Sequence, residues 1–199
     1  MNIILFGGFF GSGKTTVISR LIPPILRSGE TVCIIENEIG QNSIDDLLLE
    51  TAQIEINTIS GGCVCCEVTG NLIYAIEDLE KRLHPDWLVI ELTGIAFLDN
   101  LRQTLLSSLP DHHPVICVSV IDAARWSRLL RAAGQVITNQ VRGGDIIVIN
   151  KTDLNPEVDD IFTDVFRIAG ERILVPMSAK SDCADMLLNI LSREAESNV

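Results

Sequence analysis

A glycine-rich stretch near the N-terminus has the residue types that bind a polyphosphate. Residues 8–15 read G-F-F-G-S-G-K-T, which fits the pattern G-x-x-x-x-G-K-[S/T] between an apolar run and a helix-length segment. Such glycines let backbone N–H groups curl around phosphates, and the helix that follows presents its positive end to them. Lys14 is expected to bridge the β- and γ-phosphates and Thr15 to ligate Mg²⁺. The alternative is a glycine-rich turn that binds nothing. The expected nucleotide-binding residues are Gly8, Gly11, Ser12, Gly13, Lys14, Thr15 and Thr16.

A second motif can select the base. Residues 150–153 read N-K-T-D and follow the apolar run 146–149, so they lie where ligands gather at the carboxyl end of a parallel strand. Asp153 can accept hydrogen bonds from the ring N–H and the 2-amino group of guanine, a donor pair that adenine lacks. Lys151 can cover the purine face and Asn150 can hold the loop. An Asn/Asp turn would also explain the tetrapeptide, but its position after the phosphate motif favours GTP.

A shorter match follows the apolar run 173–175. Ser178, Ala179 and Lys180 are expected to close the base pocket with backbone N–H groups. A chance match is the rival interpretation of so short a segment.

An acidic residue ends another apolar run, at 87–90. Glu91 is expected to hold the water shell of Mg²⁺, and the N–H of Gly94 to sense a γ-phosphate. The alternative for Glu91 is a satisfied carboxylate at a strand end. Lys14, Thr15 and Glu91 form the expected charge-stabilising catalytic set. No residue is assigned to orient the attacking water, so hydrolysis is expected to be slow without a partner.

Three cysteines crowd together after a glycine pair. Residues 61–66 read G-G-C-V-C-C, and Cys63, Cys65 and Cys66 can converge on one soft or borderline cation. Redox exchange or an inert cluster are the alternatives. By contrast, Cys33 and Cys117 lie inside apolar runs and are interpreted as core residues.

Three thiolates leave one tetrahedral position open. Glu36 or Glu38, a partner protein or water could fill it. His112 and His113 are further candidates, but they are interpreted as a solvated loop, and His84 as a surface residue. The thiols admit Zn²⁺, Co²⁺, Ni²⁺ or Cu⁺ without deciding among them.

Seven apolar runs alternate with helix-length segments, which indicates an α/β fold: a doubly wound, mostly parallel sheet covered on both faces. The expected strands are 3–6, 32–35, 54–59, 87–90, 115–121, 146–149 and 173–175. The expected helices are 14–27, 70–82, 97–106, 123–133, 156–168 and 184–195.

Bulk composition narrows the partners. The chain has 199 residues, of which 47% are apolar, and a formal net charge of −12. That length suits one domain over residues 1–199. The negative charge disfavours nucleic acid and anionic membranes as partners. No apolar run is long enough to cross a bilayer and no signal peptide is evident, so a cytoplasmic location is expected.

The chain resembles the CobW family of P-loop GTPases, which includes proteins regarded as zinc, cobalt and nickel chaperones. Beyond the phosphate motif, the matching segments are E-N-E-I-G at 36–40, G-G-C-V-C-C at 61–66, E-L-T-G at 91–94, V-I-D-A at 120–123 and N-K-T-D at 150–153.

The resemblance implies a SIMIBI-type G domain in which GTP binding and hydrolysis to GDP gate the capture or delivery of a metal. It also implies Cys65 and Cys66, with Cys63 and Glu36, as metal ligands. A client metalloprotein is the implied partner, and related G proteins make a nucleotide-dependent homodimer a further expectation.

Three departures from the family pattern limit this transfer. The C-terminal domain of many members is expected to be absent, a histidine-rich stretch is missing, and Gln41 replaces an acidic residue. Two other functions therefore remain open. One is a GTPase that loads a corrinoid or other metalloenzyme, and the other is a nucleotide-binding module with structural zinc.

Overall fold

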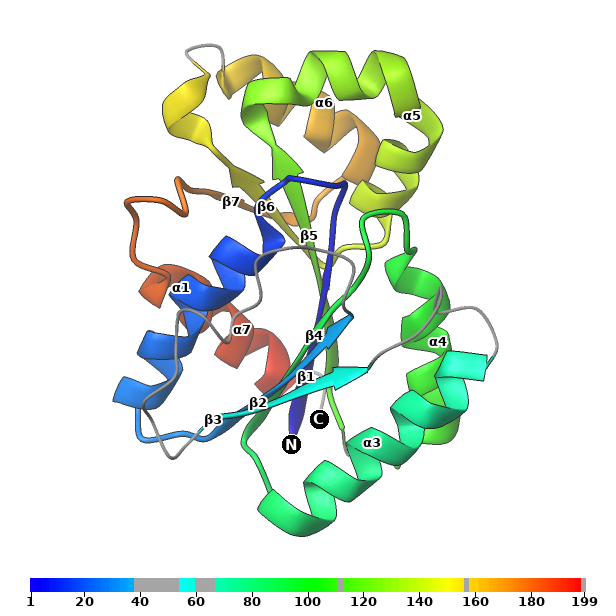
Figure 1. The fold of residues 1–199 in the computed structure, drawn as a ribbon. Coiled ribbons are helices and arrows are strands. Elements are labelled where there is room, and N and C mark those ends of the chain that lie inside the picture. Colours follow the sequence, from blue (N-terminus) through cyan, green and yellow to red (C-terminus); the bar gives the residue numbers. More distant parts are fainter. Residues whose placement is uncertain (38–53, 60–66, 111–112, 156–157, 198–199) are drawn as a thin grey trace.

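The described part of the chain forms one seven-stranded parallel sheet. The computed structural model describes residues 1–37, 54–59, 67–110, 113–155 and 158–197. The strand order is β3-β2-β4-β1-β5-β6-β7, and every neighbouring pair is parallel (Figure 1). The strands are β1 (Asn2–Gly7), β2 (Val32–Asn37), β3 (Ile54–Ile59), β4 (Trp87–Glu91), β5 (Val115–Asp122), β6 (Ile146–Asn150) and β7 (Ile173–Pro176).

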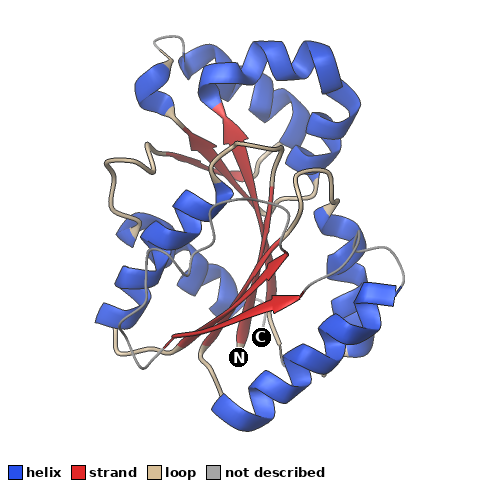
Figure 2. Cartoon of the chain, in the orientation of Figure 1, coloured by secondary structure: helices blue, strands red, loops and turns tan. Residues whose placement is uncertain are grey.

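Helices cover both faces of this sheet, which confirms the doubly wound α/β prediction (Figure 2). Ile4 and Phe6 of β1 pack with α1 and α7, whereas Ile3 and Leu5 point to the opposite face and pack with α3 and α4. A third apolar cluster joins β6 to α5 and α6. The helices are α1 (Lys14–Arg27), α3 (Glu67–Leu83), α4 (Leu98–Ser108), α5 (Trp126–Arg142), α6 (Val158–Ala169) and α7 (Asp185–Ser197).

Strand burial follows from covering both faces. All eight residues of β5 are buried, and so are all five of β6, because parallel strands joined by helical crossovers have no solvent face. None of the helices in the described residues is both long and apolar enough to span a membrane.

One predicted helix was too short. The segment expected at 123–133 begins with a 3₁₀ turn at Ala123–Arg125 and continues as α5 to Arg142. The helix passes through Gly134 with a kink at Ala133, where φ is −141° and ψ is 35°. Burial of Ile137 and Val141 stabilises the second half, so tertiary packing overrides the glycine.

The interpretation of His113 as solvated was wrong. Its side chain is 1% exposed, with Nε2 3.1 Å from a carboxylate oxygen of Glu80 and Nδ1 3.3 Å from the carbonyl oxygen of Met1. His84 is exposed, as predicted, and His112 lies outside the described residues.

Candidate nucleotide site

The phosphate motif joins β1 to α1 in a backbone path that needs glycine. Gly8 has φ 140° and Gly13 has φ 93°, values that side-chain-bearing residues rarely adopt. A Cβ at Gly8 would collide with the carbonyl oxygen of Val120, and one at Gly13 with the side-chain amide of Asn150. The loop therefore packs tightly against the ends of β5 and β6.

Lys14 begins α1 and lies inside this loop. Its side chain is buried, and Nζ donates a hydrogen bond to the Gly8 carbonyl oxygen at 2.9 Å. Burial lowers the pKa of Lys14, and the nearby charge of Glu91 opposes that shift. An ammonium held in such an enclosure interacts strongly with an arriving phosphate, because little water screens it.

Thr15 and Glu91 provide oxygen atoms next to that lysine. Thr15 Oγ1 lies 2.9 Å and 3.0 Å from the two carboxylate oxygens of Glu91, to which it donates. Burial raises the pKa of Glu91; Lys14 and the Thr15 hydrogen bond lower it, and Glu36 raises it further. A hydroxyl and a carboxylate are hard ligands of the kind that fit Mg²⁺, which when bound would neutralise charge on the β- and γ-phosphates.

These residues line one open cleft. Its other wall is the segment after β4, where Gly94 packs under the ring of Phe10. A Cβ on Gly94 would lie 2.6 Å from that ring, so only glycine fits. The cleft thus brings together the predicted residues Lys14, Thr15, Glu91 and Gly94.

Asn150 connects the phosphate loop to the predicted base loops. Its Nδ2 donates to the Ser12 carbonyl oxygen at 2.8 Å, and its Oδ1 accepts from the N–H groups of Lys151 at 2.8 Å and Ala179 at 3.0 Å. The residue is 2% exposed. The predicted loop-holding role of Asn150 agrees with this geometry.

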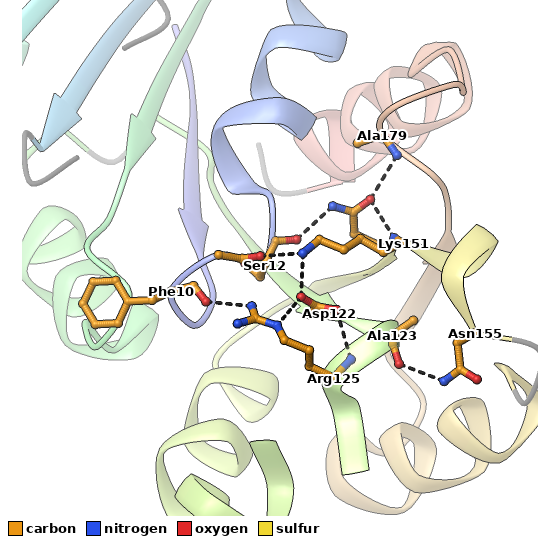
Figure 3. Close-up of polar contacts among 10 residues, drawn as sticks. Phe10, Ser12, Asp122, Ala123, Arg125, Lys151, Asn155 and Ala179 are labelled. Atoms are coloured by element: carbon orange, nitrogen blue, oxygen red, sulfur yellow. Dashed lines mark hydrogen bonds and ion pairs between the residues drawn. The ribbon is translucent and has the colours of Figure 1, made fainter. Parts of the chain in front are cut away.

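Two important residues of this network, Asp122 and Arg125, were not predicted as site residues. Asp122 is buried and accepts hydrogen bonds from Lys151 Nζ at 2.6 Å and from Arg125 Nε at 2.7 Å. Lys151 Nζ also donates to the Gly11 carbonyl oxygen, and Arg125 Nη2 to that of Phe10 (Figure 3). The available signal was an acid ending the apolar run of β5, at the same sheet edge as the other motifs.

The two segments expected to bind the base differ in how their polar groups are used. Asp153 is exposed, and its carboxylate has no hydrogen bond within the described residues. The N–H groups of Ser178 and Ala179 were expected to face the base, but they donate to Asp182 and Asn150. Among the residues that the structure covers, the N–H of Lys180 has no acceptor, so it remains the candidate base donor.

Arg20 of α1 fixes this last loop. Its Nε donates to the Ala179 carbonyl oxygen at 2.9 Å, and its Nη2 to that of Lys180 at 2.6 Å. The loop is therefore positioned by the helix that also carries Lys14 and Thr15.

The predicted cargo-metal site is only partly described. Cys63, Cys65 and Cys66 lie outside the described residues, as does Glu38. Within the described ranges no group of three or more His, Cys, Asp and Glu side chains forms a metal-binding set. Glu36 is described: it is 6% exposed and pairs in register with Glu91 on the neighbouring strand.

A parallel sheet with a lysine-containing glycine loop at its carboxyl edge and a carboxylate on the adjacent strand defines the P-loop nucleotide-binding class. A family model described as CobW/HypB/UreG, nucleotide-binding domain, matches residues 2–172. The chain belongs to this family of P-loop GTPases.

Two named relatives support this family assignment. The zinc chaperone YjiA of Escherichia coli is 31% identical over 179 residues, covering 83% of this chain and 54% of YjiA. Zinc-regulated GTPase metalloprotein activator 1 of Schizosaccharomyces pombe is 31% identical over 162 residues, covering 76% of this chain and 39% of the relative. The chain thus spans about half the length of these relatives, or less.

A solved structure has a similar fold. The crystal structure of the hydrogenase maturation factor HypB from Archaeoglobus fulgidus superposes with a TM-score of 0.69 at 22% identity, covering 96% of this chain and 90% of HypB.

Proposed function

We propose that this chain binds and hydrolyses GTP and that its nucleotide state controls the affinity of a metal at the cysteine segment 63–66. The observation that carries the proposal is the in-register pairing of Glu36 with Glu91. Glu91 belongs to the Mg²⁺ side of the cleft, and Glu36 is the described member of the candidate cargo-metal set. One pair of adjacent strands therefore serves both sites.

The proposed coupling is electrostatic and mechanical. Mg²⁺ bound with GTP would place a cation beside Glu91, and the γ-phosphate would fix the 91–94 segment; both would change the field at Glu36. Hydrolysis and loss of the γ-phosphate would release the 91–94 segment. The nucleotide can change metal binding only if the GTP-bound and GDP-bound chains bind the metal with different affinities. The coupling is therefore measurable as a ratio of metal affinities.

The metal is proposed to be Zn²⁺, with Co²⁺ and Ni²⁺ as alternatives, because thiolate ligands accept all three. YjiA carries the name zinc chaperone, which supports zinc first. The receiving partner is proposed to be a client metalloprotein, and a cytoplasmic, reducing setting would keep the thiols available. A nucleotide-dependent homodimer is proposed as the working assembly.

The test is the metal affinity of the reduced protein, by competition with a chromophoric chelator, in GDP and in a non-hydrolysable GTP analogue. We expect the two affinities to differ by about 5-fold or more, and Cys65→Ser to remove tight binding. Cys183→Ser is the matched control, because Cys183 is an exposed thiol outside the motif. Tight binding that ignores the nucleotide, together with unfolding on zinc removal, would instead favour a structural zinc site.

The second candidate is a GTPase that loads a metalloenzyme without holding the metal itself. The specific observation in its favour is that one relative, 31% identical over 162 residues, carries the name zinc-regulated GTPase metalloprotein activator 1. Capture of a defined metal-free client by the GTP-bound chain, with no metal bound to the chain alone, would favour this function.

A further inference from the structure

A residue outside the nucleotide motifs contacts Gly94, which lines the nucleotide cleft. Gln140 lies near the end of α5, and its Nε2 donates a 2.8 Å hydrogen bond to the carbonyl oxygen of Gly94, 46 residues earlier. The Gln140 side chain is 2% exposed. A buried amide is retained where its hydrogen bonds are satisfied, and this bond is the one that Gln140 makes to the cleft wall.

Gly94 is held from two sides. The ring of Phe10 fills the space where a side chain would begin, and Gln140 holds the carbonyl oxygen. Its N–H has no hydrogen-bond acceptor within the residues described by the structure. Because Gly94 also lines the cleft with Lys14 and Thr15, this donor is available to a ligand there.

Glycine has more backbone freedom than any other residue, so an unrestrained Gly94 would lose much entropy on binding a phosphate oxygen. A hydrogen bond that fixes the peptide plane after Gly94 in advance lowers that loss, and preorganisation of this kind appears as affinity. The contribution applies only to a ligand that reaches Gly94.

We propose that Gln140 is a positioning residue that sets the preference for GTP over GDP by fixing the backbone of Gly94 for contact with the γ-phosphate. The inference rests on the proposed nucleotide site, because it places the γ-phosphate beside Lys14 and Gly94. GDP lacks the group that reaches Gly94, so its affinity is independent of the Gln140 bond.

Two substitutions separate this role from plain packing. Gln140→Met keeps a side chain of similar length but removes the donor. Gln140→Glu keeps the shape and places a carboxylate oxygen against the carbonyl oxygen. The matched control is Gln135→Met on the same helix, because Gln135 is exposed and bonds only to Asn139 among the described residues.

The experiment measures Kd for GDP and for a non-hydrolysable GTP analogue, with Mg²⁺, by fluorescence titration, and records Tm for each variant. We expect Gln140→Met to lower the ratio of GTP-analogue to GDP affinity about 3- to 10-fold, the range for one lost hydrogen bond. Gln140→Glu is expected to lower it further, with GDP affinity within twofold of wild type and Gln135→Met unchanged.

An unchanged ratio in Gln140→Met, or an equal loss for both nucleotides, overturns the inference and leaves the GTP site intact. If the wild-type chain binds neither nucleotide, the proposed function itself fails. If the wild-type chain binds both nucleotides equally, γ-phosphate sensing by Gly94 is wrong and the inference fails with it.

Discussion

Glu36 and Glu91 face each other in register at the carboxyl ends of the neighbouring parallel strands β2 and β4. Each is removed from most solvent. Burial raises the pKa of Glu91, Lys14 and the Thr15 hydrogen bond lower it, and the charge of Glu36 adds a smaller increase. A divalent cation beside Glu91 would favour its ionised form, because an opposite charge stabilises a carboxylate.

The first prediction concerns pH and Glu91→Gln in the absence of Mg²⁺. The folded-state pKa of Glu91 is raised, so the folded state holds its proton at pH values where the unfolded state has lost it. The resulting stability is present below the ordinary carboxyl pKa and is lost as pH rises through the raised value. The side chain of Gln in Glu91→Gln carries no titratable proton, so this dependence is absent in the variant.

The free energy of unfolding of wild type, measured by urea titration with a chelator present, should therefore fall relative to that of Glu91→Gln as pH rises from about 4 to 8. Parallel pH profiles for the two proteins would contradict the assignment. At neutral pH, adding Mg²⁺ with GTP should raise the free energy of unfolding of wild type more than that of Glu91→Gln, because the variant lacks the carboxylate.

The second prediction concerns base recognition by Asp153. Asp153→Asn replaces an acceptor with a group that presents a donor to the guanine ring N–H, so GTP affinity should fall by about 100-fold or more. Xanthosine triphosphate, which has a carbonyl where guanine has an amino group, should bind to Asp153→Asn better than GTP does. Competition titration measures both affinities, with Asp159→Asn at an exposed position of α6 as the control. Equal loss of both nucleotides would argue against the base contact.

The third prediction concerns Asn150. Asn150→Ala removes three hydrogen bonds and leaves the Ser12 carbonyl and the Ala179 N–H unpaired. The free energy of unfolding should fall by about 2–4 kcal/mol. Asn139→Ala on the surface of α5 should cost less than about 0.5 kcal/mol. Urea denaturation distinguishes the two, and a matching small loss at both positions would mean that Asn150 is not structurally central.

The fourth prediction concerns thiol reactivity. Burial, reinforced by Asp145, raises the pKa of Cys117 to about 12, and Cys33 is also buried. Cys183 is exposed beside Arg27 and Asp185. Iodoacetamide at pH 8 should alkylate Cys183 of the native protein and leave Cys117 and Cys33 unmodified, as read by peptide mass spectrometry. Rapid labelling of Cys117 without denaturant would contradict its placement in the core.

Much of the fold could be predicted because the local signals agree with the tertiary structure. The prediction of α1 as 14–27 was confirmed at both ends. Gly13, in the left-handed conformation, precedes its first residue. The strand at 54–59 was also confirmed. Runs that are almost wholly apolar, such as 3–6 and 146–149, identified the parallel sheet, although 54–59 contains polar residues.

The parts that were missed depend on contacts between distant segments. Nothing local to Gln140 or Arg125 indicates that one bonds to Gly94 and the other to Phe10. The burial of His113 depends on Glu80 and Met1, which adjoin it only in the folded chain. Sequence motifs identified the residues expected to touch the nucleotide, but not those that position them.

The central position of β1 has a consequence for synthesis of the chain. The first of the described strands to be made lies between β4 and β5, so it stays without a neighbour until β4 (Trp87–Glu91) has been made and gains its second neighbour only with β5 (Val115–Asp122). Its phosphate loop also needs Asn150 from β6. Because such pairings are distant in sequence, folding is expected to be slow for the length of the chain. A nascent chain that already carries the whole phosphate motif therefore cannot complete its binding site until Asn150 has left the ribosome.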